Sequence, residues 1–184
     1  MKVKDIFYIS NLLSLSRVVL VGPIFYFLKL QTPTAKYWAV VFMLVAAATD
    51  IFDGRLARRL NQVSDYGRII DPVADKIGIA VVAIVLVTTR GLPLWYLIAI
   101  VARDATILVF GLFLVQRTKR VVESNKIGKV TVTALGAVVI VFTLQIDAVK
   151  WVFLWISVGL LALSSASYFW KLITLLKQQS QEFA

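Results

Sequence analysis

Six long apolar segments follow one another along the chain, with short polar stretches between them. A transmembrane helix needs about 20 mostly apolar residues, so each segment is long enough to cross a bilayer. The predicted spans are residues 12–29, 35–58, 67–89, 93–116, 128–146 and 149–173. Because several connections are short, neighbouring spans are expected to be antiparallel. The pattern predicts an all-α integral membrane protein with six transmembrane helices in a single domain over residues 1–184.

Basic residues are divided unequally between the two ends of these predicted spans. One side of the membrane receives thirteen lysines and arginines, and the other receives four: Lys29, Lys36, Arg90 and Lys150. Because cytoplasmic segments carry the excess of positive charge, the first side is expected to be cytoplasmic, with both chain termini on it. We expect the protein to lie in a bacterial inner (cytoplasmic) membrane. This rule, together with attraction to anionic lipids, explains the net charge of +10 without a nucleic-acid partner.

The amino-acid composition indicates a membrane protein and excludes several kinds of catalytic and metal site. Hydrophobic residues make up 60% of the chain, whereas soluble domains have about 45–50%. The chain has no cysteine and no histidine, which excludes disulfide bonds, thiolate and imidazole nucleophiles, and the usual zinc sites. Any bound metal is therefore expected to be held by oxygen atoms, which Mg²⁺ and Mn²⁺ prefer.

Half of the ten acidic residues fall in one stretch, DIFDGRLARRLNQVSDYGRIIDPVADK, at residues 50–76. If residues 50–58 form a helix, one face carries two carboxylates, two small residues and one guanidinium. These residues are Asp50, Asp53, Gly54, Ala57 and Arg58. The small residues leave room for a bulky anion such as a nucleotide pyrophosphate, and the arginine can neutralise its charge.

A second acidic face is expected on a helix that starts near Ser64–Asp65, where Gly67, Asp71 and Asp75 recur every four residues. The two helices are adjacent and antiparallel, so their faces can bring four carboxylates together. Unpaired carboxylates would repel or bind protons, whereas divalent cations would neutralise them. Two such cations about 3.5–4 Å apart can hold a phosphoryl group for in-line displacement. The alternative is that the acids form salt bridges with neighbouring arginines near the membrane surface.

The residues of both faces resemble the signature of the CDP-alcohol phosphotransferases, D-x2-D-G-x2-A-R-x8-G-x3-D-x3-D. Every element and every spacing is present between Asp50 and Asp75. The resemblance implies a six-helix membrane fold and an enzyme that transfers a phosphatidyl group from CDP-diacylglycerol to an alcohol, with release of CMP. It also implies Mg²⁺ or Mn²⁺ as cofactor, with two ions bound.

The same resemblance implies a role for each residue of the motif. The implied metal ligands are Asp50, Asp53, Asp71 and Asp75. Asp71 and Asp75 are the implied catalytic carboxylates, with Asp75 as ligand, general base, or both. The residues implied to bind the CDP moiety are Gly54, Ala57, Arg58 and Gly67.

Within this family, NLLSLSRV at residues 11–18 and SDYGRIIDPVADK at residues 64–76 most resemble the phosphatidylglycerophosphate synthases. The implied acceptor is then glycerol 3-phosphate, an anion that needs cationic partners. The candidates for this role are Arg103, Lys126 and Lys129. The motif is equally valid for phosphatidylglycerol, inositol phosphate and serine as acceptors, so these stay open. The implied partners are CDP-diacylglycerol, the acceptor and membrane lipids, and the resemblance also allows a homodimer.

Arg103 and Asp104 are charged residues inside a predicted span. Adjacent helical side chains diverge by about 100°, so these two are not expected to pair with each other. Each is expected to find a partner on another helix or in a cavity, and for Arg103 a structural ion pair and a substrate contact both stay open. The run of small residues at 164–167 is expected to allow close helix packing and to have no chemical role.

Three other functions fit parts of the pattern. A membrane prenyltransferase also uses acidic motifs with Mg²⁺, but the Gly-x2-Ala-Arg spacing argues against it. A cation carrier or channel could use the carboxylates as ion sites, but the chain lacks paired broken helices in its two halves. A catalytically inactive scaffold would have no use for an intact metal motif. The sequence therefore favours the CDP-dependent transferase.

Overall fold

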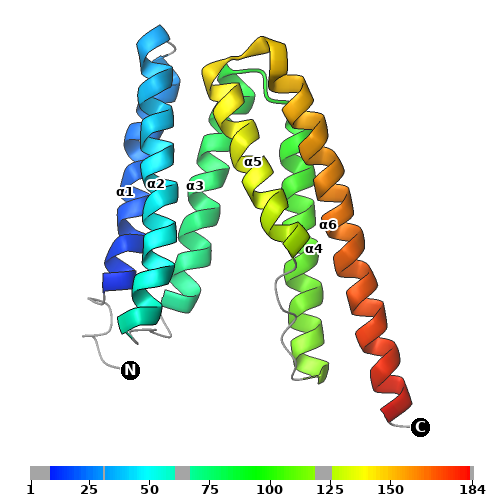
Figure 1. The fold of residues 1–184 in the computed structure, drawn as a ribbon. Helices are drawn as coiled ribbons and strands as arrows, with labels where there is room; N and C mark the ends of the chain where they lie inside the picture. The colour runs from blue at the N-terminus through cyan, green and yellow to red at the C-terminus, as the bar shows by residue number, and fades with distance from the viewer. Residues whose placement is uncertain (1–8, 31, 61–66, 119–125, 183–184) are drawn as a thin grey trace. The chain divides into compact units, whose positions relative to one another are not determined.

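The computed structural model describes residues 9–30, 32–60, 67–118 and 126–182. Side chains are described for residues 19–30, 32–49, 78–107, 109, 127–171 and 173–174. Six α-helices occupy the described residues, and no strand occurs among them. The helices are α1 (Ile9–Leu30), α2 (Pro33–Leu60), α3 (Gly67–Thr89), α4 (Leu94–Thr118), α5 (Lys126–Leu144) and α6 (Asp147–Glu182) (Figure 1). The all-α fold predicted from the sequence is confirmed.

Each predicted span has a helix in its place, and the largest difference lies at the C-terminal end. There, α6 continues to Glu182, well beyond the predicted end of the last span at residue 173. The added residues are mostly polar, with the sequence TLLKQQSQE. Polar residues end a predicted apolar span, but they do not end a helix. Glutamine, glutamate, lysine and leucine all favour helical conformation, so α6 continues through them.

Two described helical stretches are long and apolar enough to cross a membrane, Ile127–Leu144 and Asp147–Lys171. Only 28% and 22% of the residues in these stretches, respectively, are buried inside the protein, so most of their residues keep some surface outside it. Shorter apolar helical stretches occur at Val19–Leu30, Pro33–Thr49 and Gly78–Thr89. The structure therefore supports a membrane protein. That all six helices cross the membrane stays a prediction.

The chain divides into two compact units, Met1–Leu92 and Pro93–Ala184. In the first unit, α1 packs against both α2 and α3. Leu28, Ala39 and Leu86 have no exposed surface there. Phe27 of α1 stacks on Phe42 of α2, with the ring centroids 5.7 Å apart. The apolar stripe of α1 is therefore covered from two sides, which fixes its place in the unit.

The C-terminal end of α3 is closed by a tight turn. Gly91 has a φ of 73°, a left-handed conformation that glycine adopts without steric cost. The N–H of Leu92 then donates to the carbonyl of Leu86 at 3.2 Å. The turn leaves Arg90 only 6% exposed, and its Nη2 donates to the carbonyl of Leu28 near the end of α1 at 3.4 Å. This contact joins α3 to α1 and places a positive charge at a helix C-terminus, where charge of that sign is stabilising.

In the second unit, α6 packs against both α5 and α4. Val138, Phe142 and Leu154 are fully buried in it. A hydrogen bond of 2.6 Å joins the hydroxyls of Tyr96 on α4 and Ser157 on α6. These two residues are 1% and 0% exposed, respectively. Buried polar groups need partners, and this contact supplies one to each hydroxyl.

Candidate active site

The acidic motif lies on two helices of the first unit. Asp50 and Asp53 belong to the C-terminal part of α2, and Asp71 and Asp75 belong to the N-terminal part of α3. The helical conformation predicted for both stretches is confirmed, so the two residues of each pair stand about one helical turn apart along their helix. The side chains of residues 50–77 lie outside the described residues, and the convergence of the four carboxylates stays a prediction.

The rest of the motif is divided between the same two helices. Gly54, Ala57 and Arg58 lie on α2, and Gly67 is the first residue of α3. The expected helix start near Ser64–Asp65 falls outside the described residues. Among the side chains that the structure describes, no group of three or more acidic residues gathers. A metal site on oxygen ligands therefore rests on the motif alone.

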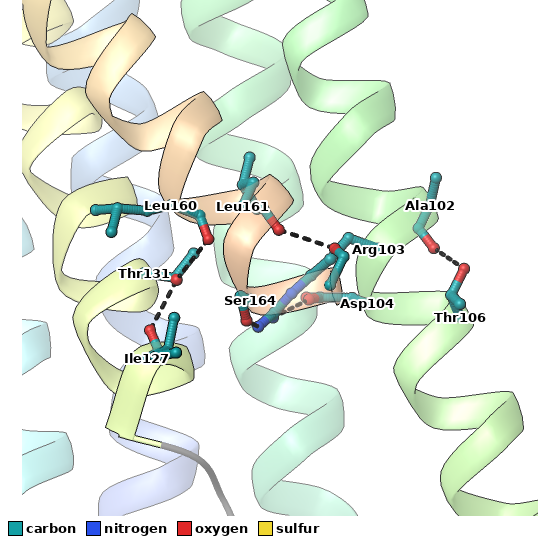
Figure 2. Close-up of polar contacts among 10 residues, drawn as sticks. Ala102, Arg103, Asp104, Thr106, Ile127, Thr131, Leu160, Leu161 and Ser164 are labelled. Atoms are coloured by element: carbon teal, nitrogen blue, oxygen red, sulfur yellow. Dashed lines mark hydrogen bonds and ion pairs between the residues drawn. The ribbon is translucent and has the colours of Figure 1, made fainter. Parts of the chain in front are cut away.

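A second group of polar side chains lies in the second unit and is centred on Arg103 of α4 (Figure 2). Its side chain is 12% exposed. Nη1 donates to Oδ1 of Asp104 at 2.8 Å, and Nη2 donates to Oγ of Ser164 on α6 at 2.7 Å. Two different nitrogens of one guanidinium are therefore held by groups from two helices. Partial burial strengthens both contacts, because water competes less for the charged group.

The contact between Arg103 and Asp104 corrects the expectation that these neighbours would not pair. That expectation followed the directions in which adjacent side chains leave a helix. The arginine stem is long enough for its guanidinium to turn back toward the neighbouring carboxylate, which is 38% exposed. The other part of the expectation, a partner on another helix, is confirmed for Arg103 by Ser164. For Asp104 it stays a prediction.

The first turn of α5 also lies against this group. A Cβ atom added to Gly128 would stand 3.8 Å from Nη2 of Arg103 and 3.9 Å from Oγ of Ser164. Glycine thus brings the backbone of α5 close to the pair, and α4, α5 and α6 meet at this point. We refer to Arg103, Asp104, Gly128 and Ser164 as the Arg103 cluster.

Thr131 joins α5 to α6 one helical turn beyond Gly128. The residue is fully buried. Its Oγ1 lies 2.8 Å from the carbonyl oxygen of Ile127 in the same helix and 3.2 Å from that of Leu160 on α6 (Figure 2). The hydroxyl can therefore donate within its own helix or across to the next one, and this contact fixes how α5 and α6 face each other.

Of the three cations expected at an acceptor phosphate, the structure describes two side chains. Arg103 is largely buried, and its Nε has no hydrogen-bond partner among the described residues. Lys129 is exposed and directly follows Gly128 of the cluster. Lys126 is the first residue of α5, and its side chain lies outside the described residues. The gathering of the three cations around one phosphate stays a prediction.

Sequence reasoning missed Ser164 and Thr131 as polar partners. The small-residue run was assigned to packing alone, whereas Ser164 is fully buried and binds a guanidinium. A signal was present in the spacing, because Ser157 and Ser164 stand seven residues apart and between them Leu161 is also buried. Serines at that spacing on an apolar helix face indicate polar contacts to a neighbouring helix.

Comparison with known proteins agrees with the family resemblance of the motif. A family model described as CDP-alcohol phosphatidyltransferase matches residues 7–163. A CDP-diacylglycerol–glycerol-3-phosphate 3-phosphatidyltransferase of Bacillus subtilis is 31% identical over 187 residues, which cover 90% of this chain and 95% of that protein. The protein of the same name from Escherichia coli K12 is 38% identical over 132 residues, which cover 70% of this chain and 72% of that protein.

A relative that carries a different name is also similar. A cardiolipin synthase (CMP-forming) of Streptomyces coelicolor is 38% identical over 105 residues. The match covers 55% of this chain and 48% of that protein, so the chain spans about half the length of this relative. The matched family model begins before the acidic motif and ends one residue before Ser164.

Proposed function

Because the chain belongs to the CDP-alcohol phosphatidyltransferase family, we propose that it transfers a phosphatidyl group from CDP-diacylglycerol to glycerol 3-phosphate. The products are phosphatidylglycerophosphate and CMP. The chain is an enzyme of this class. The choice of acceptor is supported chiefly by the match to the Bacillus subtilis glycerol-3-phosphate enzyme, which extends over 95% of that protein. A fold by itself would not assign an acceptor.

The proposed reaction is an in-line displacement at phosphorus. The hydroxyl oxygen of the acceptor bonds to the phosphorus that carries diacylglycerol, and the bond from that phosphorus to the oxygen of CMP breaks. CMP leaves with that oxygen, and the hydroxyl proton passes to Asp75, the proposed general base. Asp71 is the second proposed catalytic carboxylate, one turn before Asp75 on α3.

The motif also fits a divalent metal. Its carboxylates offer only oxygen ligands, which suits Mg²⁺ or Mn²⁺, and the two residues of each pair stand about one helical turn apart in the chain. The proposed ligands are Asp50, Asp53, Asp71 and Asp75, with two ions in all. When bound, the ions supply positive charge that stabilises the pyrophosphate and the departing CMP.

The remaining residues of the motif are proposed to bind the two substrates. Gly54, Ala57 and Gly67 leave space along the helix backbones for the CDP moiety, and Arg58 neutralises its phosphates through a forked contact. For the acceptor phosphate we propose Arg103, Lys126 and Lys129. Support for Arg103 comes from its described contacts, which use one N–H of each terminal nitrogen and leave other donors of the guanidinium to bind an anion.

We further propose that the chain is a single six-span domain of the bacterial inner membrane, with both termini and the active site cytoplasmic, and that it can form a homodimer. Because the chain has no cysteine, a thiol reagent labels only a cysteine that has been introduced, and its accessibility shows on which side of the membrane that position lies. Thr34→Cys is expected to react with a membrane-impermeant maleimide in intact cells, whereas Gln178→Cys reacts only after permeabilisation. The opposite pattern would contradict the proposed orientation.

The experiment that tests the function is CMP release from CDP-diacylglycerol by the purified protein with Mg²⁺. The acceptor panel contains glycerol 3-phosphate, phosphatidylglycerol, inositol, inositol phosphate and serine. Release with glycerol 3-phosphate alone is the expected result. Release with another acceptor only would keep the family chemistry and refute the acceptor. Folded protein that releases no CMP with any acceptor would refute the proposed function.

A second candidate function is cardiolipin synthesis, in which phosphatidylglycerol is the acceptor. It is favoured by one observation, the 38% identity to the Streptomyces coelicolor cardiolipin synthase. That match covers only 48% of the relative, whereas the glycerol-3-phosphate enzymes are covered over 95% and 72%. The same assay separates the two candidates, because phosphatidylglycerol is in the panel.

A further inference from the structure

The guanidinium of Arg103 is held in one orientation before any substrate arrives. An arginine side chain has many rotamers, and ordering it on binding costs conformational entropy. Here Asp104 accepts from Nη1 and Ser164 accepts from Nη2, at 2.8 and 2.7 Å. Contacts through two nitrogens from two helices fix both the position and the plane of the guanidinium. A group ordered in advance binds its ligand at a lower entropic cost.

The hydroxyl of Ser164 is used differently from that of its neighbour. Serine inside a helix commonly donates to a carbonyl of the preceding turn, and Ser165 does so, with Oγ 2.8 Å from the carbonyl oxygen of Leu161. Ser164 instead faces α4, is fully buried, and accepts a hydrogen bond from a charged donor. A hydrogen bond to a charged group is stronger than one between neutral groups.

Asp104 would compete for the whole guanidinium if Ser164 were absent. A carboxylate and an arginine favour a forked contact in which two N–H groups bind two oxygens. Ser164 binds Nη2 from another helix and so leaves Asp104 with a contact through Nη1 only. The positive charge is therefore shared between the two helices, and it is not fully paired with the nearest carboxylate.

We infer that Ser164 is a positioning residue for Arg103, which by binding Nη2 keeps the guanidinium turned away from a forked contact with Asp104 and available to the phosphate of the acceptor. This inference rests on the proposed function, because it takes Arg103 to bind the acceptor. It assigns a role in acceptor affinity to a residue just beyond the stretch that the family model matches, residues 7–163.

The test compares the steady-state kinetics of four variants with those of the wild type. Ser164→Ala removes the acceptor of the hydrogen bond, and Ser164→Cys replaces it with a weaker acceptor of similar volume. Ser165→Ala is the matched control, because that hydroxyl bonds only within α6 in the described contacts. Arg103→Gln removes the charge itself. All variants are first shown to be folded by their melting temperature in detergent.

For Ser164→Ala we expect about a tenfold rise in the KM for glycerol 3-phosphate, with the KM for CDP-diacylglycerol within twofold of the wild type. Ser164→Cys should shift in the same direction by a smaller factor, and Ser165→Ala should match the wild type. A merely structural role would change the melting temperature or both KM values together, and would not give this selective rise.

The possible failures are distinguishable. An unchanged KM for glycerol 3-phosphate in Ser164→Ala, together with a raised one in Arg103→Gln, would overturn the role of Ser164 and leave that of Arg103 intact. An unchanged KM in Arg103→Gln would overturn both roles and leave the overall reaction intact. A wild type that releases no CMP would refute the proposed function before any variant is compared, and the inference with it.

Discussion

The buried pair of Tyr96 and Ser157 allows a quantitative test of the packing between α4 and α6. Ser157 Oγ donates to the carbonyl of Leu154 at 2.7 Å, so its only proton is already used. The proton in the 2.6 Å contact between the two hydroxyls must then come from Tyr96, with Ser157 as acceptor. The two substitutions Tyr96→Phe and Ser157→Ala therefore remove different ends of one bond.

The expected costs of these substitutions differ. Tyr96→Phe removes the donor and leaves Ser157 bonded to Leu154, so it should cost about 0.5–1.5 kcal/mol of the free energy of unfolding. Ser157→Ala leaves the tyrosine hydroxyl buried without an acceptor, which costs about 1–3 kcal/mol. In the double variant neither end remains, so it should be more stable than Ser157→Ala alone by roughly 1 kcal/mol.

The assay is reversible unfolding of the purified protein by titration with sodium dodecyl sulfate in mixed micelles, followed by circular dichroism. Tyr37→Phe serves as a control, because Tyr37 is 59% exposed and its substitution should have little effect. Destabilisation of the double variant by the sum of the two single costs would refute the proposed hydrogen bond between Tyr96 and Ser157. Additive costs would mean that the two hydroxyls do not interact in the folded protein.

Three further predictions concern other positions. Asp71→Asn should abolish CMP release while the protein still folds and inserts, and near-normal turnover would contradict the two-metal proposal. Thr131→Val should lower the free energy of unfolding by about 0.5–1.5 kcal/mol, whereas Thr133→Val, at an exposed position, should leave the unfolding titration unchanged. Gly128→Ala should raise stability by roughly 0.5–1 kcal/mol, because its Cβ has ordinary contacts of 3.8 Å or more. Gly78→Ala should not show this gain in the same titration, because its Cβ would stand 3.3 Å from a side chain of α1.

The helices could be predicted from the sequence because their signal is local. Apolar segments of the right length separated by polar residues indicate helices with approximate boundaries. The apolar pattern marks where a helix can cross a membrane, but it does not mark where the helix ends. The polar residues at the end of α6 continue the helix because they favour helical conformation, so the predicted span stops before the helix does. Six helices are not the same as six membrane spans, because only two described stretches are both long enough and apolar enough to cross a membrane.

The side-chain partners could not be predicted to the same extent. In a soluble helix the apolar stripe marks the face that packs inward, but in a membrane helix both the packed and the lipid-facing sides are apolar. The rotation of α4 and α6 about their axes is therefore poorly marked in the sequence. Arg103 stands out in the sequence as a charge inside an apolar span, whereas Ser164 belongs to a run that predicts only close packing. Their mutual contact depends on that rotation.

The two polar contacts between α4 and α6 together determine the axial register of these helices. Tyr96 with Ser157 and Arg103 with Ser164 are both separated by 61 residues. An equal offset at both contacts means that the two helices run in the same direction with matching spacing, about 10 Å between contacts on each helix. A slide of α6 by one helical turn, about 5.4 Å, would break both contacts at once, whereas apolar surfaces alone would permit it. Motions of the second unit during turnover are therefore expected to be tilts of whole helices, with α4 and α6 moving together.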